Sequence, residues 1–289
     1  AKEAFEVLSP YYAILRMDGD EMGKWLGGEK FPAIREVIHP ALRGIRDNDY
    51  QKLISSRHPI SPSWHAEFSY RLLDFSQEAK EVVENNRGVV IYAGGDDLLA
   101  LLPLEYALNA AFKVRKIFGE KLGPQGSISA GIAVVHHKYP LGPSLEASLE
   151  AEKLAKTRYG RDAFCVKVLK RSGPLLTFGS KWEVYGIEMP ELIEGLKKGF
   201  LQEDFSLRIA FDFASVISKV YREGEASPRI IELSGIELRR LFLRRTKEEK
   251  KRKAEELVDH LNTFLECIGN PLELANLLLL SAFLARRGE

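Results

Sequence analysis

Apolar residues follow strand and helix spacings in a regular order along the chain. Residues 11–17 form a β-prone apolar run that ends abruptly at Asp18-Gly19-Asp20. Residues 63–86 carry apolar side chains at helical spacing, and the polar cluster at 85–88 ends that helix. Two short apolar runs then flank Gly94-Gly95-Asp96-Asp97, which predicts a hairpin with acids at its corner.

The following residues continue this alternation of strands and helices. Their spacing predicts a helix over 105–122, a strand over 127–136, a helix over 144–159 and a strand over 161–169. Residues 31–62 predict a short helix with an irregular insertion before the long helix. The order β, α, β-hairpin, α, β, α, β predicts an α+β, ferredoxin-like core with its helices on one face of the sheet.

The spacing changes after Gly173-Pro174. Helical periods recur at 209–221, 234–242, 254–267 and 271–285, which predicts an all-α bundle. We therefore expect one domain over residues 1–174 and a C-terminal helical domain over 175–289. The apolar run 272–284 is too short to cross a bilayer, so no membrane partner is expected.

Composition adds few constraints to this picture. The 289 residues are 45% apolar and 29% charged with a net charge of +1, as in a globular protein with no overall nucleic-acid signature. The only cysteines, Cys165 and Cys267, lie too far apart in the chain to indicate a zinc knot or a disulfide framework. A reducing, cytoplasmic location is the expected one.

Three acids at strand ends are the strongest chemical signal. Asp18 ends the first predicted strand, and Asp96 and Asp97 occupy the hairpin corner. Grouped carboxylates repel one another unless a cation or a shared proton joins them. Oxygen ligands suit Mg²⁺, and a pair of such ions can clamp both oxygens of a phosphoryl transfer. Gly94 and Gly95 would permit a positive φ and a close substrate approach, although Gly-Asp turns also occur in ordinary hairpins.

These motifs resemble a known family. The segments Asp18 to Gly23 and Gly94 to Asp97 look like the large, polymerase-like subunit of type III CRISPR effector complexes, most closely the Cmr (type III-B) branch, and His65-Ala66 at the start of the long helix fits it too. Diguanylate cyclases share the palm fold and a similar downstream pattern, seen here in 127–133, 151–156 and 160–162. The resemblance spans residues 11 to 170 in the same motif order.

The resemblance implies synthesis of cyclic oligoadenylates from ATP with Mg²⁺ or Mn²⁺. It also implies that the protein joins other subunits of a CRISPR ribonucleoprotein complex and contacts guide and target RNA at least indirectly. It implies Asp96 and Asp97 as catalytic residues. The implied metal ligands are Asp18, the Gly19 carbonyl, Asp96 and Asp97. The implied nucleotide-binding residues are Asp20, His65, Gly94, Gly95, Lys153 and Lys156, with Asp20 alternatively capping the next helix. The chain resembles only the C-terminal part of such a subunit, because it has no His-Asp nuclease segment and no zinc cysteines.

A basic run lies in the predicted bundle. Residues 239–253 carry nine Arg or Lys side chains against Glu248 and Glu249. On a helical stretch, such a run either faces solvent or contacts RNA phosphates or an acidic neighbouring subunit. The candidate contacts are Arg244, Arg245, Lys250 and Lys251.

Two other functions stay open. Leu98 replaces the aromatic residue that ends the diguanylate cyclase motif and Asp97 replaces its usual glutamate, which argues against guanine specificity and favours the resemblance to the CRISPR-type palm. A GTP-using enzyme of the diguanylate type is therefore the first alternative. The second is a palm that serves as a scaffold without chemistry in this fragment.

Overall fold

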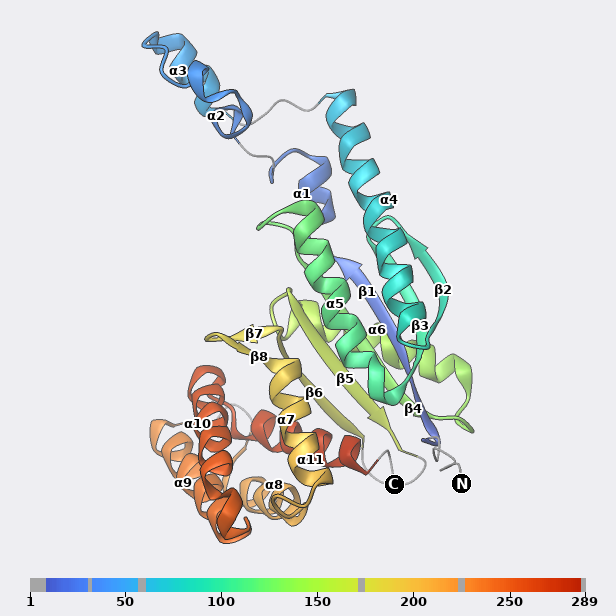
Figure 1. Cartoon of the computed structure of the whole chain (residues 1–289), viewed down its shortest axis with the longest axis vertical. Helices are drawn as coiled ribbons and strands as arrows, with labels where there is room; N and C mark the ends of the chain where they lie inside the picture. Colours follow the sequence, from blue (N-terminus) through green and yellow to red (C-terminus); the bar gives the residue numbers. More distant parts are fainter. Residues whose placement is uncertain (1–8, 31–32, 57–60, 171–174, 223–226, 287–289) are drawn as a thin grey trace.

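The core of the molecule is a six-stranded sheet in the order β2-β3-β1-β4-β5-β6 (Figure 1). The computed structural model describes residues 9–30, 33–56, 61–170, 175–222 and 227–286. The strands are β1 (Tyr11–Gly19), β2 (Val89–Gly94), β3 (Asp97–Pro103), β4 (Ile128–His136), β5 (Ala163–Leu169) and β6 (Leu176–Lys181). β1 is antiparallel to both β3 and β4, whereas β4 and β5 run parallel. The predicted ferredoxin-like order is confirmed.

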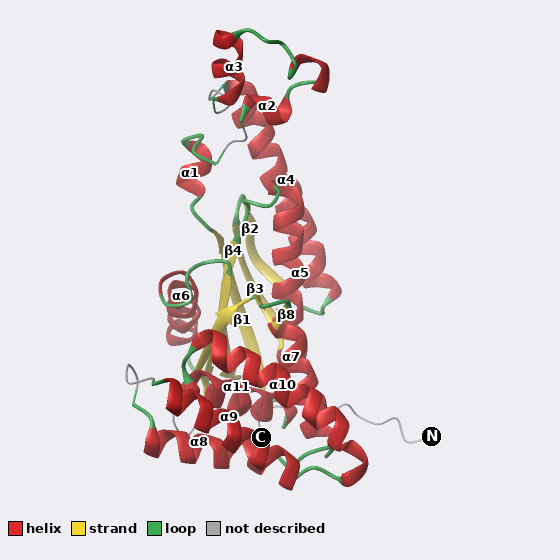
Figure 2. Ribbon diagram, turned by 90° about the vertical axis from the view of Figure 1, so that its left-hand side faces the viewer, coloured by secondary structure: helices red, strands yellow, loops and turns green. Residues whose placement is uncertain are grey.

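Helices cover both faces of this sheet. α4 (Pro62–Asn85) and α5 (Leu104–Leu122) pack on one face, and α6 (Leu141–Thr157) packs on the other (Figure 2). The prediction that all helices lie on one face was therefore wrong. α6 is the crossover between parallel strands β4 and β5, and eight of the nine residues of β4 are buried because both faces are covered.

Strand β1 divides its side chains between these two layers. Ala13, Leu15 and Met17 belong to the core beneath α4 and α5, whereas Ile14 belongs to the core beneath α6. Because successive side chains alternate between faces, Asp18 lies on the α6 side. The sheet therefore presents the strand-end carboxylate toward the C-terminal half of α6.

The insertion between β1 and α4 is mostly helical. It contains α1 (Met22–Leu26), α2 (Ile34–Val37), a 3₁₀ turn (Pro40–Leu42) and α3 (Asn48–Ser55), and α2 and α3 project away from the sheet (Figure 1). Residues 57–60 of the predicted irregular insertion lie outside the described residues. Pro62 opens α4 after Ser61, whose hydroxyl accepts a hydrogen bond from the amide of Trp64 at 3.2 Å.

The C-terminal region is a helical bundle packed against the sheet. After the hairpin β7 (Glu183–Val184) and β8 (Ile187–Glu188), it comprises α7 (Met189–Leu201), α8 (Arg208–Val220), α9 (Pro228–Arg244), a 3₁₀ turn (Glu248–Lys250), α10 (Lys251–Ile268) and α11 (Pro271–Ala285). β6 pairs with β5, so the sheet continues beyond residue 174, where we had expected the first domain to end. Within the described ranges, no helix is long and apolar enough to cross a membrane.

Candidate functional site

The strand end and the hairpin corner bring the three predicted acids together. The β1–β3 register ends at Met17 opposite Leu98, so one further position sets Asp18 opposite Asp97. Gly94 pairs with Asp97, which leaves Gly95 and Asp96 as the two-residue turn. The predicted hairpin with acids at its corner is confirmed, and the alternation of strand side chains gives Asp18 and Asp97 the same face.

The two hairpin glycines differ in conformation. Gly95 adopts a φ of 63°, in the left-handed region that favours glycine at this type of turn. Gly94 has no positive φ, and a Cβ atom there would lie 2.9 Å from the hydroxyl of Tyr92. The turn therefore needs a glycine at position 95 for its backbone conformation. At position 94, close packing against Tyr92 disfavours a larger side chain.

Asp96 packs across the end of β1. A Cβ atom on Gly19 would lie only 2.8 Å from Oδ2 of Asp96, so this close approach requires glycine at position 19. Burial raises the pKa of Asp96, and neighbouring Asp97 adds to the shift, while backbone hydrogen bonds to Asp96 and Gly19 oppose it. The raised pKa identifies a carboxylate that would gain from a nearby cation.

Lys156 forms an ion pair with Asp18, one of these acids. Its ammonium group contacts the carboxylate of Asp18 and lies 3.4 Å from Oε1 of Glu152, with 18% of the side chain exposed. Burial, followed by the nearby charges of Arg161 and Arg16, lowers the pKa of Lys156 to about 8, although the adjoining carboxylates favour its charged form. The structure thus brings together Lys156 and the predicted metal ligands.

Glu152 and Arg16 complete this cluster, and sequence analysis missed both. Nε of Arg16 donates to Oε2 of Glu152 at 2.9 Å, and the Glu152 side chain is 9% exposed. Burial raises the pKa of Glu152 and the hydrogen bond from Arg16 opposes that shift. A Cβ atom on Gly131 would lie 2.2 Å from the amide nitrogen of Glu152, so glycine lets α6 approach β4 closely enough to form the cluster. The available signal was residue spacing. Arg16 and Asp18 lie two residues apart on β1 and so share a face of the sheet, and Glu152 and Lys156 lie four residues apart on α6 and so share a face of the helix.

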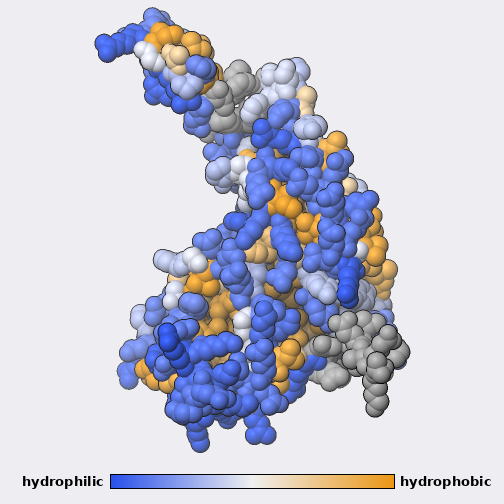
Figure 3. All heavy atoms as spheres, in the orientation of Figure 1, coloured by the Kyte–Doolittle hydropathy of each residue, from blue (hydrophilic) through white to orange (hydrophobic). Residues whose placement is uncertain are grey.

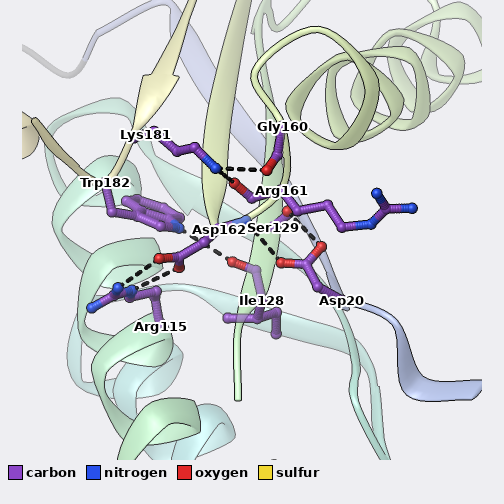
Figure 4. Close-up of polar contacts among 9 residues, drawn as sticks. All are labelled: Asp20, Arg115, Ile128, Ser129, Gly160, Arg161, Asp162, Lys181 and Trp182. Atoms are coloured by element: carbon purple, nitrogen blue, oxygen red, sulfur yellow. Dashed lines mark hydrogen bonds and ion pairs between the residues drawn. The ribbon is translucent and has the colours of Figure 1, made fainter. Parts of the chain in front are cut away.

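Asp20 is directed into the protein. Its side chain accepts hydrogen bonds from the Ser129 hydroxyl at 2.8 Å and from the amide of Asp162 at 2.9 Å (Figure 4). The capping alternative was wrong, because the residue before α1 is Glu21 and no side chain caps that helix. The residue is 1% exposed, so both oxygens serve contacts inside the fold. Its suggested contact with a nucleotide stays a prediction.

The other predicted nucleotide-binding residues lie at the margins. Lys153 is exposed on α6, three residues before Lys156. His65 is half-buried in the first turn of α4. Next to it, Trp64 lines a hollow of about 380 Å³. The hollow is lined by Trp25, Lys30, Glu36, Trp64, Glu67, Phe68, Arg71, Leu122, Pro124 and Gln125, and does not include His65. The roles of Lys153 and His65 stay predictions.

The basic run is not one helix. α9 ends at Arg244, and α10 begins at Lys251 after a short turn. Three of the four predicted contact residues form intramolecular ion pairs: Arg245 with Asp212, Lys250 with Asp204 at 3.5 Å, and Lys251 with Glu248 at 2.5 Å. Arg244 is exposed at the end of α9. Part of the positive charge is therefore balanced within the bundle.

The geometry fits a divalent cation without forming a finished metal site. Among the described residues, no group of three His, Cys, Asp or Glu side chains is arranged to hold an ion. Mg²⁺ commonly takes only one or two protein carboxylates and completes its shell with water and substrate phosphates. Asp18 and Asp97, which share a face, meet that requirement once Lys156 moves from Asp18.

Comparisons with known proteins agree on one family. The model of the Cas10/Cmr2 second palm domain matches residues 11–165. The CRISPR system Cmr subunit Cmr2 of Pyrococcus furiosus is 36% identical over 264 residues, 89% of this chain and 29% of that protein. Cmr2 of Saccharolobus solfataricus is 35% identical over 83 residues, 28% of this chain and 8% of that protein. The fold resembles that of a type III-B Cmr-beta structure in the apo state, with a TM-score of 0.57, 18% identity and coverage of 84% of this chain and 35% of the other. The chain thus spans less than a third of the length of its Pyrococcus relative.

Proposed function

The chain belongs to the Cas10/Cmr2 family of CRISPR subunits, and from that premise we propose that it is a metal-dependent, ATP-binding palm. It acts in the large subunit of a type III-B effector complex. The observation that carries the proposal is the meeting of Asp18, Asp97 and Lys156 at the end of β1. Carboxylates there suit a divalent cation, and an adjoining ammonium group suits phosphate oxygens.

In this proposal the acids of the site bind the metal ion and its basic residues bind the phosphates of the nucleotide. Asp18 and Asp97, with Asp96 beside them in the turn, would hold Mg²⁺ or Mn²⁺, which would supply charge neutralisation at the phosphates. Lys156 leaves Asp18 and pairs with the triphosphate, with Arg161 nearby. Glu152 keeps Arg16 and the C-terminal half of α6 in position. The chain's own contribution is thus to bind and orient the phosphates for attack by a 3′-hydroxyl group.

The hollow between α1 and α4 suits a nucleobase. The rings of Trp25 and Phe68 stack with centroids 5.5 Å apart, and the buried Nε1 of Trp25 has no hydrogen-bond partner among the described residues. α1 follows directly on the β1 strand end, so base and phosphates could be bound by adjoining segments. The other walls of the hollow carry polar side chains, so a base could both stack and form hydrogen bonds there. These polar residues are Lys30, Glu36, Glu67, Arg71 and Gln125. We assign ATP as the nucleotide, on the sequence departures at Asp97 and Leu98.

The partners follow from the family. We propose that other Cmr subunits and a second palm complete the assembly, and that guide and target RNA act on this palm at least indirectly. The reaction proposed for the whole complex is the formation of cyclic oligoadenylates. In isolation the chain would bind ATP and show little or no turnover.

Calorimetric titration of ATP and of GTP, each with Mn²⁺ and then with a chelator, tests this function. We expect Mn²⁺-dependent ATP binding that the double variant Asp96→Asn, Asp97→Asn abolishes while its circular dichroism stays native. The control is Asp259→Asn, an exposed acid on α10 that pairs with Arg239 at 3.2 Å.

Tighter GTP binding would support the diguanylate-type alternative. Metal-independent binding, or unchanged binding in the double variant, would contradict the site. Binding without turnover after reconstitution with the partner subunits would support the scaffold alternative.

A further inference from the structure

The loop between α6 and β5 has an unusual backbone. Gly160, Arg161 and Asp162 have φ angles of 76°, 61° and 41°, so three consecutive residues are left-handed. Residues other than glycine adopt this region at an energetic cost and keep it only where the surroundings enforce it. The conformation of Arg161 therefore depends on contacts from outside the loop.

Two cationic side chains hold this loop from the side of the sheet and of α5. Nζ of Lys181 donates to the carbonyl oxygens of Gly160 at 2.6 Å and Arg161 at 2.5 Å. The guanidinium group of Arg115 binds both carboxylate oxygens of Asp162, at 3.0 and 2.8 Å, and this ion pair raises the pKa of Arg115. Figure 4 shows the side chain of Arg161 extending away from these contacts while its backbone is held.

Asp20 supplies a further anchor, and it directly follows β1, the strand that carries Asp18. Its Oδ2 accepts the amide hydrogen of Asp162 at 2.9 Å, and its Oδ1 accepts from Ser129 at 2.8 Å. Its own amide donates to the carbonyl of Ser127 at 2.8 Å. A fully buried carboxylate thus ties the loop to the strand end that presents Asp18.

Arg161 lies beside the phosphate-facing cation of the proposed site. Its backbone amide donates to the carbonyl oxygen of Ala155 at 3.1 Å, which places Arg161 against the last turn of α6, where Lys156 lies. Asp18 and Glu152 balance the charge of Lys156 in the structure, and an anion that took their place at Lys156 would also be attracted by Arg161. A triphosphate would be that anion.

We propose that Asp20 is a positioning residue, whose buried carboxylate holds residues 160–162 left-handed so that Arg161 and Lys156 meet the phosphates of one nucleotide. This inference rests on the proposed ATP-binding function and deepens it. Asp20 thereby acts through Arg161 and touches no ligand itself.

The test compares ATP and AMP binding, with Mn²⁺, in Asp20→Ala, Asp20→Asn, Arg161→Ala and the double variant Asp20→Ala, Arg161→Ala. Loss of a charge-assisted contact should weaken ATP binding about tenfold in Asp20→Ala and leave AMP binding unchanged. The double variant should bind ATP no more weakly than Arg161→Ala alone. Asp20→Asn should restore binding, because its amide can accept from Asp162 and donate to Ser129. Asp259→Ala, a carboxylate deletion on α10, is the matched control.

A second measurement separates this inference from the proposed function. Hydrogen exchange of residues 160–162 should be about tenfold faster in Asp20→Ala than in the unaltered protein, with or without nucleotide. Unchanged exchange would overturn the positioning role, and so would additive losses of ATP affinity in the double variant. Faster exchange, together with equal ATP affinity in the unaltered protein and Arg161→Ala, would support the anchor and overturn the phosphate contact.

Discussion

The ammonium group of Lys156 lies against the carboxylate of Asp18, so an internal cation occupies the strand end where the proposed metal would bind. Both partners are partly shielded from water, with side-chain exposures of 18% and 33%. In the proposed function, Lys156 would therefore compete with a metal ion until a triphosphate drew it away. Metal and nucleotide binding should be coupled through this one side chain.

Replacing Lys156 by Met should separate the two affinities. Without nucleotide, Mn²⁺ binding measured by electron paramagnetic resonance should become about threefold tighter or more, since the competing cation is gone. ATP binding should weaken about tenfold, since the phosphates lose a charged partner. Lys113→Met, at an exposed position of α5, should change neither. Equal weakening of both affinities would show that Lys156 does not compete with the metal.

Replacing Asp96 by Asn should stabilise the fold while removing a metal ligand. Burial raises the pKa of Asp96 above its ordinary value of 3.8, so its ionised form is less favourable in the folded chain than in the unfolded one. That cost is present above the raised pKa and disappears as the pH falls below 3.8, where both states hold the proton. We expect the Asn variant to raise the Tm by about 1–4 °C at pH 7.

The difference in Tm between Asp96→Asn and the unaltered chain should shrink toward acidic pH. Scanning calorimetry from pH 7 down to about pH 3 measures it. Asp259→Asn provides an exposed acid for comparison. A lower Tm in Asp96→Asn at pH 7 would mean that the hydrogen bonds to this carboxylate outweigh its burial.

Local pattern was enough to predict most of the fold. Strand β1, the acidic hairpin and α4 to α6 all have clear apolar periods, and their order alone indicates a ferredoxin-like core. The prediction that all helices lie on one face of the sheet failed at α6. Apolar spacing shows which side of a helix is buried, but it does not show which face of the sheet that side packs against. Strand β6 was missed because we took Gly173-Pro174 as the end of the domain. Its pairing with β5 is a tertiary contact that local apolar spacing does not indicate.

Only those residues of the candidate site that belong to a local sequence motif could be predicted. Asp18, Asp96 and Asp97 stand at strand ends that can be located from the sequence. Glu152 meets Arg16 across 136 positions of the chain, and the amide of Asp162 meets Asp20 across 142. Such contacts depend on register and helix docking, and a hydrogen bond to a backbone amide leaves no residue signature.

Tryptophan fluorescence should report binding at the hollow between α1 and α4. The chain has three tryptophans: Trp25 and Trp64 line the hollow, whereas Trp182 is buried in the core. ATP with Mn²⁺ should quench the emission of the unaltered chain, because a base stacks on the exposed part of the aromatic wall. The variant Trp25→Phe, Trp64→Phe keeps Trp182 as reporter and should lose most of this response. A full response from Trp182 alone would contradict base binding in this hollow.

Asp204, in the turn between α7 and α8, restrains part of the basic run. Nζ of Lys253 lies 3.1 Å and Nζ of Lys250 lies 3.5 Å from its carboxylate oxygens, and these contacts, with Lys253 first, lower the pKa of Asp204. A lowered carboxylate pKa stabilises the fold above the ordinary value of 3.8, and this contribution is lost as the pH falls. Asp204→Asn should therefore lower the Tm by about 1–3 °C at pH 7, and less at pH 3.

The same substitution should release two cations for an anionic partner. If the turn between α9 and α10 contacts RNA, Asp204→Asn should bind single-stranded RNA more tightly, with a steeper loss of affinity as salt increases. Glu194→Gln on α7 is the matched control, since Glu194 pairs with Lys197 at 3.0 Å, outside the basic run. Fluorescence anisotropy at several salt concentrations measures both variants. An RNA affinity and salt slope equal to those of the unaltered chain would show that these lysines contribute to the bundle and not to RNA binding.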